Sequence, residues 1–322
     1  MKYGPCSLGG VCLIAGIFQA KAEEINYPTR PVRIVTGFAA GGNTDIIARA
    51  VARKLTDLLG QSVIVENKPG AGSMMGSDYV AKATADGYTL LLVSGAFTTQ
   101  AAVIKKLPFD PLHDFAWISN AVSYPFAIVV NPSLPWQNVS DLIAFAKKNP
   151  TKINYGSVGV GSVLHLAAEL FNVTANVEMT HIPYKGGAEH VFELMSGRID
   201  VVFETLTSAF PYIQSGKLRV LAVTSLERSL QLPQVPTVTQ TLPGYEVSSF
   251  SGFCAPRETP KPVIQRLNQQ LKSILQMEDI RKRFTELGGT VDYTTPEAFA
   301  LRIESETAKW KRIAKAKKIE IL

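Results

Sequence analysis

Two glycine-rich turns contain the residue types of this sequence that are best suited to bind a ligand. The first spans residues 38–45 and reads Phe-Ala-Ala-Gly-Gly-Asn-Thr-Asp, and the second spans residues 155–162 and reads Tyr-Gly-Ser-Val-Gly-Val-Gly-Ser. Each turn lies between an apolar segment and a helical pattern. Glycine lets a ligand approach the backbone closely, and the first residues of a helix present N–H donors that the helix does not use. The two turns therefore predict two half-sites that close on one small anion.

Hydroxyl side chains accompany these backbone donors. Thr44 belongs to the first turn, and Ser157 and Ser162 belong to the second. A third turn at 183–187, Pro-Tyr-Lys-Gly-Gly, precedes another helical pattern. Hydroxyls and helix-start amides suit a carboxylate. Asp45 partly offsets this preference, and as a ligand contact it favours an ammonium group or a bridging water.

The sequence lacks the motifs of common nucleotide-binding and hydrolytic sites. It contains neither the phosphate-binding loop Gly-x-x-x-x-Gly-Lys-[Ser/Thr] nor the nucleophile turn Gly-x-Ser-x-Gly. Its four histidines have no metal-ligand spacing, so neither a metal nor a cofactor is expected. Ser162 and His165 lie three positions apart on a predicted helix, which places them side by side. A secreted hydrolase using this pair is the alternative from another class, whereas a helix cap at Ser162 is the interpretation we favour.

The elements that must position these turns indicate an α/β fold with two lobes. Strands and helices alternate in the first third of the chain and again between 124 and 224, and each pattern predicts a largely parallel sheet covered on both faces. We expect residues 27–123 plus 247–322 to form lobe 1 and residues 124–246 to form lobe 2, so the chain crosses between lobes twice. Such a hinged clamp binds its ligand at the interface. Strands are expected at 32–38, 62–66, 89–94, 126–131, 153–156, 178–182, 199–203, 218–224 and 247–255, and helices at 45–59, 76–83, 140–149, 162–171, 187–195, 207–214, 262–277, 279–287 and 296–318.

The first 22 residues are expected to be a cleaved signal peptide. Lys2 precedes a short apolar segment at 8–18, and Ala20-Lys21-Ala22 fits a small-x-small cleavage site, which predicts cleavage before Glu23 and export to the periplasm. The apolar segment is shorter than the ~20 residues that a membrane-spanning helix needs.

Cysteine content and charge exclude further classes of site. Export leaves Cys254 as the one cysteine of the mature chain, so no intrachain disulfide is expected, and its apolar surroundings predict a buried thiol. The formal charge is +6, and basic residues gather at 309–318. We interpret this segment as the solvated face of the last helix, and we expect no nucleic-acid partner.

Eight motifs together resemble the periplasmic solute-binding receptors of the tripartite tricarboxylate transporter (Bug) family. Each motif is weak by itself, but they occur in order over essentially the whole mature chain. They are Phe38-x-x-Gly41-Gly42-x-x-Asp45-x-x-Ala48-Arg49, Val65-Glu66-Asn67-Lys68-Pro69-Gly70-Ala71-Gly72, Asp86-Gly87-Tyr88-Thr89-Leu90, Leu107-Pro108-Phe109-Asp110-Pro111, Asn154-Tyr155-Gly156-Ser157, Gly161-Ser162-x-x-His165-Leu166-Ala167-x-Glu169, Pro183-Tyr184-Lys185-Gly186 and Leu242-Pro243-Gly244-Tyr245-Glu246.

The resemblance implies a monomeric receptor of the Venus flytrap type (type II-like), which captures a small organic carboxylate between its lobes and delivers it to the permease subunits of a tripartite tricarboxylate-type transporter. A receptor that feeds a sensor kinase is an open alternative. In the family, backbone groups and ordered waters provide much of the contact, without an arginine. Carried over, the ligand contacts are Phe38, Gly41, Gly42, Thr44, Asp45 (near a bridging water) and Ser94 in lobe 1, and Ser157, Gly159, Ser162, Tyr184, Lys185, Gly186 and Glu204 in lobe 2.

This sequence departs from the family pattern at four places. Ala40 stands where a proline is common, Gly187-Ala188-Glu189-His190 replaces a small residue and a proline, Glu204-Thr205 replaces Asp-Asn, and the segment 95–98 lacks the usual hydroxyls. These positions surround the distal half of the ligand. The resemblance therefore predicts the carboxylate end of the site and leaves the substrate open among dicarboxylates, aromatic acids and amino acids.

Overall fold

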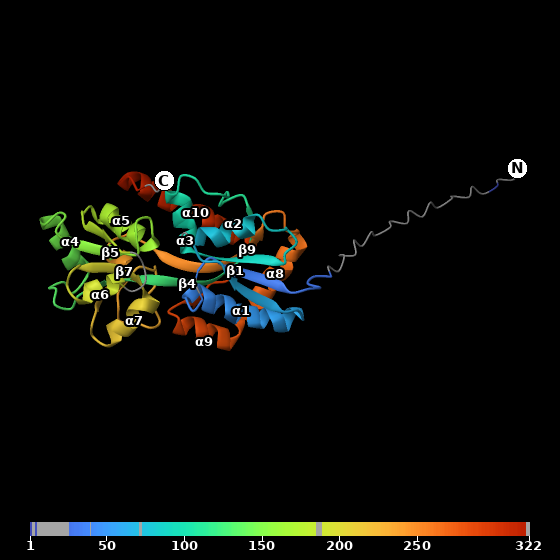
Figure 1. Cartoon of the computed structure of the whole chain (residues 1–322), viewed down its shortest axis with the longest axis horizontal. Helices are drawn as coiled ribbons and strands as arrows, with labels where there is room; N and C mark the ends of the chain where they lie inside the picture. Colours follow the sequence, from blue (N-terminus) through green and yellow to red (C-terminus); the bar gives the residue numbers. More distant parts are fainter. Residues whose placement is uncertain (2–3, 5–25, 39, 71–72, 185–188, 320–322) are drawn as a thin grey trace.

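One mixed β-sheet runs through both ends of this elongated molecule (Figure 1). The structure is a computed structural model that describes residues 1, 4, 26–38, 40–70, 73–184 and 189–319. Within these residues the strand order is β2-β1-β3-β9-β4-β7-β5-β6, and β8 and β10 pair with β4. The strands are β1 (Val32–Thr36), β2 (Val63–Asn67), β3 (Thr89–Ser94), β4 (Phe115–Val130), β5 (Asn154–Ser157), β6 (Thr180–Pro183), β7 (Val201–Thr205), β8 (Arg219–Val223), β9 (Ser248–Pro256) and β10 (Thr290–Val291).

Helices cover both faces of the sheet, as the alternating pattern predicts. In the first lobe (β1–β3 with α1–α3, α8 and α9), apolar residues of α1, α8 and α9 pack on one face and those of α2 and α3 on the other. In the second lobe (β5–β8 with α4–α7), α4 and α5 cover one face and α6 and α7 the other. The helices are α1 (Asn43–Leu59), α2 (Met74–Ala81), α3 (Gly95–Val103), α4 (Val139–Lys148), α5 (Val163–Ala175), α6 (Glu189–Met195), α7 (Leu206–Gln214), α8 (Lys261–Gln276), α9 (Glu278–Glu286) and α10 (Pro296–Lys317), with a short 3-10 turn at Val238–Gln240.

Two strands connect the lobes. The chain leaves the first lobe along β4, which pairs with β9 as far as Pro125 and with β7 from Phe126 onward. It returns along β9, which lies between β3 and β4. Because β4 and β9 are neighbours throughout this crossing, the lobes share a two-stranded connection of the kind that a hinge requires.

The predicted strand at 126–131 is only the last part of β4. Its earlier part was missed because Ser119 and Asn120 interrupt the apolar pattern, although both are fully buried. Their polar groups are satisfied from a distant segment: Ser119 Oγ donates to the carbonyl of Thr294 (2.9 Å), and the Asn120 N–H donates to Thr294 Oγ1 (2.9 Å). Helix α3 and the short strand β10 were also not predicted.

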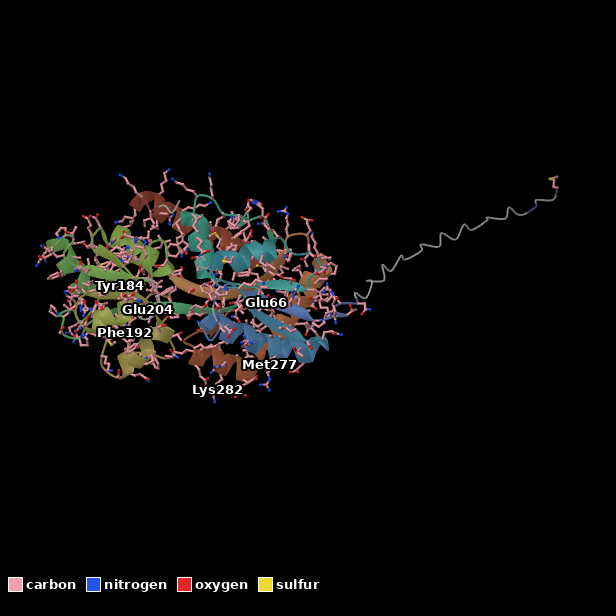
Figure 2. The ribbon with its side chains drawn as sticks, viewed as in Figure 1. Glu66, Tyr184, Phe192, Glu204, Met277 and Lys282 are labelled. Atoms are coloured by element: carbon pink, nitrogen blue, oxygen red, sulfur yellow. The ribbon has the colours of Figure 1, made fainter. Side chains whose placement is uncertain are left out.

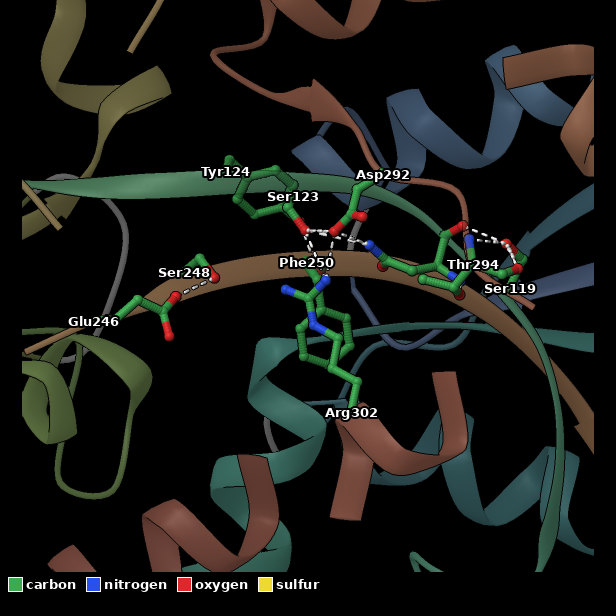
Figure 3. A network of polar contacts seen from close by, with 10 residues as sticks. Ser119, Ser123, Tyr124, Glu246, Ser248, Phe250, Asp292, Thr294 and Arg302 are labelled. Carbon is green, nitrogen blue, oxygen red and sulfur yellow. Dashed lines mark hydrogen bonds and ion pairs between the residues drawn. The ribbon is translucent and has the colours of Figure 1, made fainter. Parts of the chain in front are cut away.

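Helix α10 links the two lobes. Its first half packs through Phe299 and Ile303 on the first lobe, and its second half packs through Trp310 and Ile313 on the second. Where β4 and β9 connect the lobes, Arg302 Nη1 donates to Asp292 Oδ2 (2.6 Å) and to Ser123 Oγ of β4, as Figure 3 shows. Helix α10 therefore packs against both lobes.

Two simpler expectations are confirmed. Cys254 is fully buried, and burial raises the pKa of its thiol well above the ordinary value. Most basic residues of 309–318 are exposed on α10, as expected for a solvated helix face. In the described part of the chain, no helix is long and apolar enough to cross a membrane.

Candidate binding site

A cavity of about 640 Å³ lies between the lobes and is lined by both predicted glycine turns. From the first lobe it receives Phe38, Gly42, Thr44 and Ser94, and from the second Ser162. Two other hollows of similar volume occur in the described structure, one beside Arg302 at the crossing and one on the surface of the first lobe, but neither contains a predicted site residue. The interlobe cavity is therefore the candidate site.

Four helices begin at this cavity. The N-cap residues of α1, α3, α5 and α7 are Gly42, Ser94, Ser162 and Thr205, and all four line it. Each helix N-terminus has unused N–H donors and the equivalent of about +0.5 elementary charge. No described residue of the lining is Asp, Glu, Lys, Arg or His. The arrangement attracts an anion through backbone dipoles instead of charged side chains.

Asp45 organises the first turn from behind. Its carboxylate accepts hydrogen bonds from the Gly41 N–H (2.9 Å), from Arg49 Nε (2.9 Å) and from Asn67 Nδ2 (2.9 Å). The Arg49 hydrogen bond, with the other two donors, lowers its pKa from 3.8 to about 2. Asp45 is buried and is not part of the cavity lining, and its contact with a bridging water stays a prediction.

The same contacts decide which parts of the first turn face the cavity. Gly41 has φ of +83°, a conformation that favours glycine, and its N–H points to Asp45. Gly42 has φ of −77° and lines the cavity, and no side chain caps the start of α1. Thr44 and Ser94 line the cavity too, and among the described residues neither hydroxyl has a hydrogen-bond partner. These groups form the open, donor-rich part of the site.

The second turn satisfies most of its own donors. Ser162 Oγ accepts from the His165 N–H (3.3 Å) and donates to the Gly159 carbonyl (2.7 Å), which confirms Ser162 as the helix cap. The fully buried Ser157 hydroxyl contacts the same Gly159 carbonyl (3.1 Å) and His181 Nε2 (2.7 Å). Ser157 and Gly159 are absent from the lining, so they shape this turn from within.

His165 is not a general base for Ser162. Its Nδ1 accepts the Gly161 N–H (3.0 Å), while the Ser162 hydroxyl donates to a carbonyl. The rings of His165 and His181 stack with centroids 3.9 Å apart. Burial lowers the pKa of both, that of His181 to about 4, and the neighbouring His165 adds to the effect there. The pair is a neutral stack behind the turn, without the hydrogen bond that nucleophile activation needs.

Tyr184 and Glu204, which were also predicted to contact the ligand, do not line the cavity. Figure 2 shows Tyr184 and Glu204 together in the second lobe. The Tyr184 N–H donates to the Ser157 carbonyl (2.9 Å), and Glu204 is buried against His190 and accepts from the Thr205 N–H (2.7 Å). Lys185 and Gly186 lie outside the described residues.

Sequence reasoning missed most of the lining. Ala96, Thr99, Gln100 and Val103 form one face of α3 at positions i, i+3, i+4 and i+7, and all four line the cavity. This periodicity was the available signal, but the segment has no distinct apolar face and was not identified as a helix. The other missed lining residues are Asn43, Met74, Ile104, Tyr124, Phe126, Val158, Val160, Gly161, Val163, Leu164, Thr205 and Ser249. Among the described residues, no cluster of His, Cys, Asp and Glu is placed to hold a metal ion.

Comparison with known proteins identifies the family. The family model described as "Tripartite tricarboxylate transporter family receptor" matches residues 47–319. The chain belongs to this family. It is 35% identical over 309 residues to the protein named for the tcbD-tcbE intergenic region of Pseudomonas sp. strain P51, covering 95% of this chain and 92% of that protein.

Solved structures agree with this assignment. The receptor resembles R. palustris Rpa4515 with adipate (34% identity, TM-score 0.80, covering 92% of this chain and 100% of that one). It also resembles MatC from Rhodopseudomonas palustris with bound malate (29% identity, TM-score 0.76, covering 89% and 99%). These likenesses confirm the predicted α/β solute-binding fold, and the family consists of periplasmic solute-binding receptors, so the expected non-catalytic function is confirmed and the hydrolase alternative is wrong.

Proposed function

We propose that this receptor binds a small organic carboxylate in the interlobe cavity and delivers it to the membrane subunits of a tripartite tricarboxylate-type transporter. The convergence of four helix N-termini on a cavity whose described lining has no charged side chain carries the proposal. Backbone dipoles that point at an anion stabilise it without a counter-ion. That relatives hold adipate and malate supports the same ligand class.

The carboxylate contacts in this proposal come mainly from the first lobe. Gly42, Thr44 and Ser94 present an open helix start or an unbonded hydroxyl to the cavity. Asp45 and Ser157 hold the two turns in shape. We keep the remaining predicted contacts in this proposal, although not all of them line the cavity: Phe38, Gly41, Gly159, Ser162, Tyr184, Lys185, Gly186 and Glu204.

Lobe closure belongs to the same proposal. We place 27–123 plus 247–322 in lobe 1 and 124–246 in lobe 2, with β4 and β9 as the connections and α10 in contact with both lobes. A ligand that contacts both lobes stabilises the closed form by its differential affinity for that form. In the same proposal, a signal peptide at 1–22 directs the protein to the periplasm and is then removed. This segment lies almost wholly outside the described residues. The mature protein acts as a monomer.

A thermal melting screen against carboxylates tests the proposal on the purified mature protein. Binding at 100-fold over Kd stabilises the fold by about 2.7 kcal/mol, which is a readily measured increase in Tm. Gly42→Val should abolish the shift, because its side chain enters the cavity while φ of −77° accommodates valine. The matched control is Ala40→Val, which adds the same bulk at an exposed position of the same turn outside the lining.

Three results would contradict this proposal. They are a screen in which no carboxylate raises Tm, a Gly42→Val variant that binds as well as the wild type, and losses that are equal in Gly42→Val and Ala40→Val. Lys185→Ala provides the charge control. It should weaken binding less than Gly42→Val if backbone donors hold the anion.

A further inference from the structure

The two lobes offer different chemistry to the ligand that the proposed function assigns to the cavity. In the first lobe, the starts of α1 and α3 have no side-chain cap. In the second lobe, the starts of α5 and α7 are capped: the Ser162 hydroxyl accepts from the His165 N–H, and the Thr205 hydroxyl accepts from the Ser208 N–H. Donors already bonded within the protein contribute less to a ligand. Among the helix starts that line the cavity in the described structure, only those of the first lobe have no side-chain cap.

The donors of the second turn are further depleted by local hydrogen bonds. The Gly161 N–H is taken by His165 Nδ1 (3.0 Å), and the Ser162 N–H donates to the Gly159 carbonyl (3.3 Å). The hydroxyls of Ser157 and Ser162 both contact that carbonyl as well. A carboxylate placed against this turn therefore finds few donors that are not already engaged.

Apolar side chains cover the cavity where these donors are missing. Val158, Val160, Val163 and Leu164 from the second turn and the start of α5 all line it. Leu164 belongs to the apolar cluster that contains Val103 at the end of α3, and Val158 and Val163 pack against that cluster. This end of the cavity is thus an apolar pocket.

Helix α3 sets the distance between the two kinds of wall. Its cavity face begins at Ser94, beside the uncapped start of the helix, and ends at Val103 and Ile104. At 1.5 Å per residue, these ends are roughly 14 Å apart. A ligand that lies along this face has its anionic group at one end and hydrocarbon at the other.

We infer that this receptor selects a monocarboxylate with an uncharged apolar body, such as an aryl or alkyl chain, over a dicarboxylate of the same length. The first lobe holds the carboxylate, and the second lobe covers the body with valine and leucine side chains. A second carboxylate would lie against those side chains without a described cation to pair with it. Burying an unpaired polar group is costly, so the dicarboxylate should bind at least about tenfold more weakly. This inference rests on the proposed function.

Isosteric ligand pairs test the inference by isothermal calorimetry on the mature protein. Decanoate against sebacate, undecanoate against undecanedioate, and dodecanoate against dodecanedioate each exchange one methyl group for a carboxylate, and their chains are long enough to approach the apolar end. We expect the monocarboxylate to bind more tightly in every pair that binds. Thr44→Val should weaken both members of a pair alike, because it acts on the carboxylate that they share.

A charge placed on the apolar wall provides the second arm of the test. Val160 is 50% exposed and lines the cavity, so Val160→Lys can fold and should bring a cation to the distal carboxylate. It should narrow the preference for the monocarboxylate by about tenfold. Val173→Lys is the matched control, since Val173 is 43% exposed on α5 and does not line the cavity.

The outcomes separate this inference from the proposed function. If dicarboxylates bind more tightly than their partners, or if both lysine variants change the preference equally, the inference is overturned and the carboxylate receptor stands. If no member of any pair binds and no carboxylate in the wider screen raises Tm, both the inference and the proposed function are overturned. Preference for the monocarboxylates, reduced by Val160→Lys alone, supports both.

Discussion

Replacement of Asp45 by asparagine should show how the first turn is held in shape. The carboxylate of Asp45 accepts from the Gly41 N–H, Arg49 and Asn67, all at 2.9 Å. An asparagine has the same shape, but its amide group presents N–H donors to one side of this site, where the native contacts are also donors. The variant should therefore lose hydrogen bonds that only a carboxylate can accept together.

The lowered pKa of Asp45 gives the size of the effect. A decrease from 3.8 to about 2 corresponds to about 2 kcal/mol of folding stability, since one pKa unit is about 1.4 kcal/mol. Because the folded-state pKa lies below the unfolded value, this stability is present above pH 3.8 and is lost as the pH falls toward 2. Asp45→Asn should be less stable than the wild type by about 2 kcal/mol at pH 7, and the difference should shrink in acid.

Urea unfolding of both proteins between pH 7 and pH 2 measures this difference. Carboxylate binding should weaken as well, because the turn that presents Gly42 and Thr44 loses the hydrogen bonds that Asp45 makes to hold it in shape. A stability difference that is the same at every pH would show that the charge of Asp45 is not the cause. An unchanged affinity would show that its contacts do not position the turn.

Three further predictions concern the cavity and the second turn. Thr44→Val, which removes an unbonded hydroxyl at the cavity, should weaken carboxylate binding about ten- to a hundredfold by calorimetry without a change in Tm, and a normal affinity would remove Thr44 from the site. Ser162→Ala removes the cap of α5 and should reduce the unfolding free energy by about 1 kcal/mol in urea, whereas an unaltered midpoint would argue against the cap. The pKa of His181 is lowered from 6.5 to about 4, so the unfolded state takes up the proton first and stability should decrease as the pH falls from 6.5, by about 2 kcal/mol at pH 5. His181→Gln should reduce that dependence in the same urea assay, leaving the part due to His165, and an unreduced dependence would assign it to another group.

Several features of this protein follow from its sequence alone, because they depend on neighbouring residues. The strand-turn-helix order around residues 38–45 and 155–162 predicts helix starts at both turns, and α1 and α5 begin there. Thr89–Ser94 was predicted with correct bounds, since an uninterrupted apolar segment next to turn residues is typical of a buried strand. The cap at Ser162 is local too, as its partner is three residues away.

Other features were decided only by the tertiary structure. Asp45 lies in the binding motif, but its carboxylate is engaged by Arg49 of the same helix and by Asn67 of β2, and it does not line the cavity. The buried part of β4 was missed because Ser119 and Asn120 find their partner at Thr294, more than 170 residues away. Sequence spacing does not show which distant groups will satisfy a buried polar atom.

The difference between the two lobes in available hydrogen-bond donors was also decided only by the tertiary structure. Glycines and hydroxyls make the two turns look equivalent in sequence. The fold brings His165 and His181 against the second turn, where they engage the Gly161 N–H and the Ser157 hydroxyl, while Gly42 and Thr44 in the first turn stay open to the cavity. Whether a hydrogen-bond donor is available to a ligand depends on whether the fold supplies it with another acceptor. When that acceptor is distant in sequence, the sequence alone does not show it.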